Sequence, residues 1–230
     1  MSSISDNLSS IQQRIQLAAE KADRDPADIT LIAVSKTKPM SLIHDAFEAG
    51  QLDFGENKVQ EVREKQPELP DAQWHVIGTL QRNKVKYIAG WVHLIHSVDT
   101  ARLLAEISKQ AVKNERIIDC LLQMNISGEE NKHGLEEADV SDILTSLDQY
   151  PNVRIKGLMG MAEFTDDETI LRSQFGSLRT AKEKFASISH DRIELNELSM
   201  GMSGDFEIAI EEGSTMIRVG SAIFGSRNYG

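Results

Sequence analysis

Short apolar runs recur along the chain and are separated by longer segments of mixed polarity. Most of these runs are apolar almost throughout, which is typical of strands that are covered on both faces rather than on one. They occupy residues 29–35, 52–57, 74–78, 92–99, 117–127, 153–161, 193–201 and 215–225. The pattern predicts eight strands.

The intervening segments have the character of amphipathic helices. They cover residues 40–49, 58–66, 83–89, 100–114, 136–148, 167–187 and 205–212. One more helix is expected within the first 25 residues, with Ser5 or Asp6 as its N-cap. Strand and helix alternate eight times, which predicts an α/β protein with a (β/α)8 TIM-like barrel and an extra N-terminal helix.

An open, doubly wound sheet is the alternative architecture for such an alternation. That sheet usually carries a glycine-rich phosphate turn after an early strand, whereas the first strand is followed by SKTKP at 35–39. The chain also has no long internal repeat and no linker rich in Pro, Gly or Ser. We therefore expect one barrel domain that spans residues 1–230.

Composition narrows the possible partners. The formal net charge of -11 opposes binding of polyphosphate, so nucleic acid is not an expected partner. The single cysteine, Cys120, cannot form an internal disulfide, and the first residues do not resemble a signal peptide. No apolar run is long enough to span a membrane. We expect a soluble cytoplasmic protein that does not bind membranes and is a monomer or a weak dimer.

Candidate chemistry lies where the predicted strands end, because active sites of such barrels form at the carboxyl ends of the strands. Lys36 follows the first strand, Asn57 follows the second, and His75 lies within the third. A lysine at a strand end can also be an ordinary solvated charge. His75 can equally be a cofactor contact or a hydrogen-bonded core histidine.

The last two strands carry the features of an anion site. Ser199, Gly201, Ser203 and Gly204 precede a predicted helix, where free backbone N–H groups favour negative charge, although capping alone also explains them. The eighth strand runs into a second cradle at 220–221, and its arginine lies two residues earlier on the same face. These positions are Arg218, Gly220 and Ser221.

Closure of the barrel would bring the first strand beside the eighth and its lysine beside this anion site. A desolvated lysine near a cation loses its proton more easily and can then attack an aldehyde. That combination suits pyridoxal 5'-phosphate (PLP) held as an imine of Lys36. Lys38 shares the same face and is the rival, but Pro39 favours a loop position for it.

Several motifs together resemble the pyridoxal-phosphate homeostasis proteins, which are single-barrel relatives of the N-terminal barrel of alanine racemase. These motifs are AVSKTKP, DFGENKVQE, WHVIGTLQRNK, GLMGM and LSMGMSGDFEIAIEEGSTMIRVGSAIFG, and the segment SGEENKHG at 127–134 is also similar. The resemblance implies a fold-type III PLP barrel. It implies that Lys36 forms the imine, that Ser203, Gly220 and Ser221 bind the phosphate, that Arg218 faces the pyridine nitrogen, and that Asn57, Met159, Gly160 and Ser199 lie near the pocket.

The resemblance further implies a carrier or buffer of PLP, with apo PLP-dependent enzymes as recipients and no established catalytic activity. An arginine at the pyridine nitrogen opposes its protonation and weakens the ring as an electron sink. A two-base racemase also needs an acid or base opposite the lysine, and Tyr87, Tyr150 and Tyr229 are not at predicted strand ends. The alternatives left open are a PLP-dependent racemase or related enzyme, and a sugar-phosphate enzyme with a substrate imine.

The remaining signals have plain structural explanations. His93 and His96 are expected on opposite faces of the fourth strand, so no metal site is predicted. Cys120 is expected to be a packed, unreactive side chain. Four methionines near the ends of the sixth and seventh strands can form either a pocket wall or core. They are Met159, Met161, Met200 and Met202.

Overall fold

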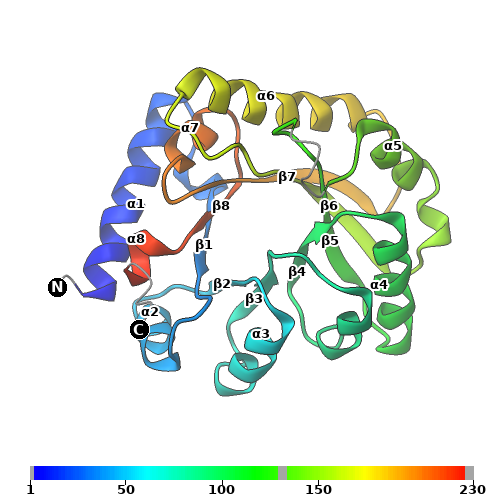
Figure 1. Ribbon diagram of the computed structural model, residues 1–230, viewed down its shortest axis with the longest axis horizontal. Helices are drawn as coiled ribbons and strands as arrows, with labels where there is room; N and C mark the ends of the chain where they lie inside the picture. The colour runs from blue at the N-terminus through cyan, green and yellow to red at the C-terminus, as the bar shows by residue number, and fades with distance from the viewer. Residues whose placement is uncertain (1–2, 129–133, 226–230) are drawn as a thin grey trace.

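The computed structural model describes residues 3–128 and 134–225 (Figure 1). Eight parallel strands form a closed barrel in sequence order, and β8 pairs with β1 to complete it. The strands are β1 (Thr30–Val34), β2 (Asp53–Glu56), β3 (Gln73–Val76), β4 (Leu94–Val98), β5 (Ile118–Gln123), β6 (Val153–Met159), β7 (Ile193–Met202) and β8 (Met216–Val219). The predicted barrel is confirmed. Most of the family-like segment 127–134, and Tyr229, lie outside the described residues.

Helices surround the ring of strands in Figure 1. The α-helices are α1 (Ile4–Lys21), α2 (Met40–Glu48), α3 (Val59–Lys65), α4 (Ala101–Lys113), α5 (Glu137–Thr145), α6 (Glu168–Phe185), α7 (Phe206–Glu211) and α8 (Ser221–Phe224). Short 3-10 helices occupy η1 (Pro26–Asp28), η2 (Gln66–Glu68), η3 (Arg82–Tyr87) and η4 (Leu147–Gln149). Within the described ranges, no helix combines the length and the apolar character needed to cross a membrane.

The N-terminal helix α1 begins earlier than the sequence predicts. Its N-cap is Ser3, whose hydroxyl accepts a hydrogen bond from the backbone N–H of Asp6, while the Asp6 carboxylate accepts one from the N–H of Ser3. This reciprocal capping box places Asp6 inside the first turn rather than at the cap. The predicted caps, Ser5 and Asp6, are therefore wrong by two or three residues.

The core has two parts because every strand is covered on both faces. A large outer core fills the space between strands and helices, and Cys120 belongs to it. Burial raises the pKa of the Cys120 thiol strongly, so this residue is the packed, un-ionised side chain that was predicted. A small inner core fills the barrel itself and consists of Ile32, Leu94, Leu121, Met159 and Met216.

The end of the chain departs most clearly from the predicted pattern. The apolar run 215–225 was expected to be one strand, but β8 ends at Val219 and residues 221–224 form the short helix α8. Ile223 and Phe224 are buried, and the side-chain amide of Asn7 donates to the carbonyl oxygen of Ile223 at 2.7 Å. Packing against α1 therefore overrides the strand propensity of this segment.

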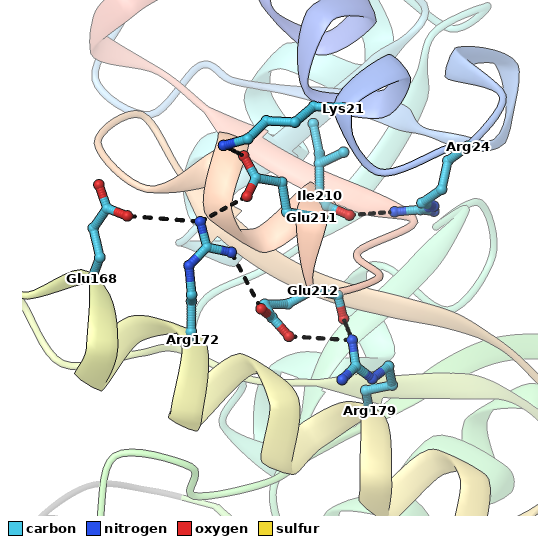
Figure 2. A network of polar contacts seen from close by, with 8 residues as sticks. All are labelled: Lys21, Arg24, Glu168, Arg172, Arg179, Ile210, Glu211 and Glu212. Atoms are coloured by element: carbon cyan, nitrogen blue, oxygen red, sulfur yellow. Dashed lines mark hydrogen bonds and ion pairs between the residues drawn. The ribbon is translucent and has the colours of Figure 1, made fainter.

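Ion pairs connect α7 with both α1 and α6 (Figure 2). Arg172 of α6 contacts the carboxylates of Glu211 and Glu212 at 2.7 and 3.3 Å, and Lys21 of α1 contacts Glu211 at 2.7 Å. Arg24 donates to the carbonyl oxygen of Ile210 at 2.7 Å. This network ties the two flanking helices to the segment that connects β7 with β8.

Candidate functional site

A cavity of about 700 Å³ lies at the carboxyl ends of the strands. Many residues on its wall come from the loops that follow β1, β2, β3, β6, β7 and β8. Seven of the site residues predicted from the sequence line it: Lys36, Asn57, Ser203, Gly204, Arg218, Gly220 and Ser221. The barrel thus brings the predicted lysine, arginine and anion loops around one space.

Lys36 lies in a tight turn directly after β1. The next residue, Thr37, has a φ of 62°, a left-handed conformation that is strained for a β-branched side chain. The backbone N–H of Thr37 donates to the Glu61 carboxylate of α3 at 2.7 Å and so helps to hold this conformation. The turn fixes the point from which the Lys36 side chain enters the cavity.

A buried ion pair supports the same turn from behind. The Lys65 amine donates to the Glu56 carboxylate at 2.7 Å and to the carbonyl oxygen of Ser35 at 2.9 Å. The Ser35 hydroxyl also donates to Glu56 at 2.7 Å. Burial raises the pKa of Glu56, although the positive charge of Lys65 opposes this shift. The residue before Lys36 is therefore anchored to α3.

Lys38, the rival of Lys36, contacts the end of the last helix. The Lys38 amine donates to the carbonyl oxygens of Phe224 and Gly225 at 3.0 and 2.9 Å, although its side chain also lines the cavity. These carbonyl groups lie at the end of α8, beyond the turn that carries Lys36. Lys38 thus links the loop after β1 to the end of α8.

The predicted anion loops adjoin each other at one side of the cavity. Gly201 has a φ of 92°, and a Cβ atom there would lie 2.6 Å from the Cβ of Ala209. This glycine allows the irregularity in the pairing of β7 with β8 that directs the chain toward Ser203. The Ser203 hydroxyl accepts a hydrogen bond from the backbone N–H of Gly220 at 3.2 Å. Residues 203 and 220 are therefore neighbours.

Arg218 forms the floor of the cavity and is almost fully buried. Its guanidinium donates to the Ser199 hydroxyl oxygen at 2.6 Å and to the carbonyl oxygen of Gly160 at 3.0 Å. Burial lowers the pKa of Arg218 to about 10, and the negative charge of Asp205 opposes this shift. The guanidinium therefore stays positively charged at neutral pH, directly beneath the cavity.

Three predicted site residues lie beneath this floor and are absent from the described cavity wall. Ser199 is fully buried and contacts Arg218. Met159 belongs to the inner core. His75 is buried and bonds to His96 at 2.9 Å and to Asp53 at 3.0 Å. Of the two possibilities for His75, the structure shows the hydrogen-bonded core histidine.

The prediction for His93 and His96 was wrong in its geometry. His93 lies before β4 rather than on it, and both imidazole rings pack against the ring of His75, at 5.0 and 5.1 Å between centroids. One ligand atom from each of Asp53, His75 and His93 lies within 4.8 Å of the others. Within this group, the Asp53 carboxylate lies 3.0 Å from Nε2 of His75, and the expectation of no metal site stays a prediction.

The methionines divide between the two roles that the sequence left open. Met161 and Met202 line the cavity and are partly exposed, whereas Met159 and Met200 are buried in the core. Sequence reasoning missed Gln123 at the end of β5, which the rule of strand ends would have identified. It also missed Phe164 in the loop after β6, whose side chain is fully exposed at the wall of the cavity.

The fold and the site together define a class of protein: a (β/α)8 barrel with a lysine after β1 and adjoining loops after β7 and β8 around one cavity. Residues 7–228 match the family model described as "Alanine racemase, N-terminal domain". The match covers nearly all of the chain.

Relatives at higher identity define the family more closely. A "Pyridoxal phosphate homeostasis protein" of Pseudomonas aeruginosa is 41% identical over 100% of this chain and 98% of its own length. One of Aquifex aeolicus is 40% identical over 97% of this chain and 98% of its own. PipY of Synechococcus elongatus, solved with PLP bound, is 36% identical, with a TM-score of 0.83 over 96% of this chain and all of that one. This chain belongs to the pyridoxal phosphate homeostasis protein family.

Proposed function

We propose that this protein binds PLP in the cavity at the carboxyl ends of the strands and takes part in PLP homeostasis as a carrier or buffer. The observation that carries the proposal is the meeting of Lys36, Arg218 and the loop around Ser203 at one cavity. PLP has an aldehyde, a pyridine nitrogen and a phosphate, and these groups would require such partners. The PLP-bound structure of a full-length relative supports the same assignment.

The residues present fit the cofactor. The Lys36 amine would bond to the aldehyde, Arg218 would face the pyridine nitrogen, and the phosphate would lie against Ser203, Gly220 and Ser221. A Cβ atom on Gly220 would come within 3.1 Å of the carbonyl oxygen of Val34, so glycine leaves this backbone free for close approach. When bound, PLP supplies an electron-withdrawing ring conjugated to its carbonyl carbon.

One carboxyl group on the cavity wall opposes the binding of an anion, but its burial disfavours the charged form. Asp205 lies on the wall beside Ser203 and would repel a phosphate when ionised. Burial raises the pKa of Asp205, and its carboxylate accepts a hydrogen bond from the backbone N–H of Met202. The phosphate therefore depends on the backbone N–H groups and hydroxyls of the loops, since α7 and α8 are too short to add a large helix dipole.

A carrier role is favoured over racemisation. A racemase needs a second acid or base that faces the lysine. Among the described residues, Tyr87 lies in η3 and Tyr150 follows η4, and neither lines the cavity. Arg218 at the pyridine nitrogen would also keep the ring a weak electron sink. Glu163, Asp166 and Asp205 do line the cavity, so the preference for cofactor holding rests on the weak electron sink and on the relatives named for pyridoxal phosphate homeostasis.

Recipient enzymes would meet the protein at the mouth of this cavity. Phe164 is fully exposed there, and Met161 and Met202 are partly exposed beside it. An exposed apolar patch of this kind is typical of a surface that contacts another protein. We therefore extend the proposal to apo PLP-dependent enzymes as recipients in the cytoplasm, with the protein acting as a monomer or weak dimer.

The test combines binding with transfer. Purified protein is titrated with PLP and followed by visible absorption, and the loaded protein is then mixed with an apo PLP-dependent enzyme whose recovered activity is measured. A carrier predicts an absorption band and transfer, with no exchange of the α-proton of added amino acids above the rate with free PLP. Rapid proton exchange would favour the racemase, and a protein that stays colourless would contradict PLP binding.

A further inference from the structure

A continuous chain of hydrogen bonds crosses the inside of the barrel below the cavity. Arg218 contacts Ser199 at 2.6 Å, Ser199 contacts His96 at 2.9 Å, His96 contacts His75 at 2.9 Å, and His75 contacts Asp53 at 3.0 Å. The chain joins β8, β7, β4, β3 and β2. It runs from the cavity floor to the first residue of β2, at the amino end of that strand.

The direction of donation along these hydrogen bonds follows from the groups at the two ends of the series. Arg218 has only donors, so the Ser199 oxygen accepts its hydrogen bond. Among the described residues, the other partner of this oxygen is Nδ1 of His96, to which the Ser199 hydroxyl can donate. At the far end, an ionised Asp53 carboxylate can only accept, so Nε2 of His75 carries a hydrogen.

With the Ser199 hydroxyl donating to Nδ1 of His96, both imidazoles are neutral rings with the hydrogen on Nε2. His96 then accepts at Nδ1 and donates from Nε2 to Nδ1 of His75, and His75 donates from Nε2 to Asp53. Every donor points from the arginine toward the carboxylate. The opposite order would leave the Ser199 hydroxyl hydrogen without this acceptor and would require a positive charge on His75.

We propose that His96 and His75 are positioning residues that hold Arg218 in place beneath the cofactor through Ser199. The proposal rests on the PLP site proposed above, because it assigns these buried histidines to the pyridine side of that site. In this arrangement the neutral His96 keeps the Ser199 hydroxyl hydrogen turned away from Arg218. A lone pair of Ser199 then remains available to the guanidinium.

The surroundings explain why such a chain has to be complete. Five apolar side chains form the inner core of the barrel, and an unpaired polar group beside them is destabilising. His96 is fully buried, and burial, with a smaller effect of the positive charge of Arg218, holds its pKa well below the usual range. A neutral imidazole is the form that the chain needs at this position.

The first test uses the protein without cofactor, so that it is independent of PLP binding. Nitrogen-15 NMR of histidine side chains distinguishes the two neutral tautomers and the cation of each of the six histidines. We expect hydrogen on Nε2 of both His75 and His96, with His96→Asn and His75→Gln used for assignment. Hydrogen on Nδ1 of His96, or a positively charged His75 at neutral pH, would overturn the proposal.

The second test measures the dissociation constant and the absorption band of bound PLP in His96→Leu and His96→Asn. The asparagine oxygen can still accept from Ser199, whereas leucine cannot. We expect leucine to weaken PLP binding by roughly three- to tenfold and to shift the band, and asparagine to recover most of both.

Ser108→Ala is the control for a general loss of buried polar contacts, because its hydroxyl donates to the carbonyl oxygen of Pro151 elsewhere. Equal PLP binding by the wild type and both His96 variants would overturn the positioning role. If His96→Leu does not fold, the histidine tautomers of the wild type and the PLP affinity of His96→Asn still decide the question. Failure of the wild type to bind PLP would instead contradict the proposed function and leave the tautomer result standing.

Discussion

Glu56 and Lys65 form an ion pair of 2.7 Å behind the turn that carries Lys36. The Glu56 side chain is fully buried, and its second carboxylate oxygen has no hydrogen-bond partner. The charge of Glu56 is therefore balanced chiefly by Lys65. Because Lys65 also holds the carbonyl oxygen of Ser35, the pair connects the stability of the barrel to the geometry of the site.

Replacing Lys65 with methionine should destabilise the protein strongly. The variant leaves the buried Glu56 without its counter-charge, and breaking such a pair from one side typically costs about 3–5 kcal/mol. The free energy of unfolding in urea measures this loss. Lys184→Met, which removes an exposed pair with Glu137, should change stability by less than about 1 kcal/mol. Equal effects of the two variants would show that burial of the Glu56–Lys65 pair is unimportant.

Acidification should weaken the fold through His96. Its pKa is lowered in the folded protein, whereas the unfolded chain should bind a proton near 6.5. Stability from this residue is therefore present above pH 6.5 and is lost as the pH falls toward the lowered value. Between pH 7.5 and 5.5 the wild type should lose about 1.4 kcal/mol more unfolding free energy than His96→Asn does. Parallel losses in the two proteins would contradict a neutral buried His96.

Removal of the Ser199 hydroxyl should affect both stability and PLP binding. Ser199→Ala leaves one guanidinium donor of Arg218 buried without its acceptor, which should cost about 1–3 kcal/mol of stability and weaken PLP binding several-fold. Ser214→Ala is the matched control, because Ser214 is equally buried but donates to backbone carbonyls away from the cavity. It should lose stability while keeping the affinity for PLP. A loss of affinity in both variants would assign the effect to general destabilisation.

Replacement of Phe164 should slow cofactor transfer without weakening cofactor binding. Its side chain is fully exposed, so Phe164→Ser should change the stability of the protein by no more than about 0.5 kcal/mol. If recipient enzymes dock on this rim, the variant should bind PLP with nearly normal affinity but transfer it more slowly to an apo-enzyme at limiting concentration. Transfer at the wild-type rate would show that recipient enzymes do not dock on the surface around Phe164.

The barrel was predictable because its strands are continuous apolar runs separated by amphipathic segments. The failures have tertiary causes. Residues 221–224 are apolar enough for a strand, but contacts with α1 fold them as a helix. The cap of α1 was misplaced because Ser3 and Asp6 satisfy each other, whereas only Ser5 and Asp6 were considered as caps.

The site was predictable as far as residues follow the ends of strands. Lys36, Ser203 and Gly220 occupy such positions, and the structure brings them to one cavity. His75 and Ser199 lie inside the barrel beneath the cavity, and their contacts depend on side chains from other strands. The sequence offers no spacing that would pair His75 with His96 or Ser199 with Arg218, because these pairs arise from closure of the barrel.

The most direct test of the central claim locates the covalent bond to PLP. Protein loaded with PLP is reduced with borohydride, digested and examined by mass spectrometry, in parallel with Lys36→Ala and Lys38→Ala. We expect a phosphopyridoxyl group on Lys36 in the wild type and in Lys38→Ala, and none at this site in Lys36→Ala. A modification on Lys38, or equal modification of all three proteins at other lysines, would contradict the assignment of Lys36 as the residue that holds the cofactor.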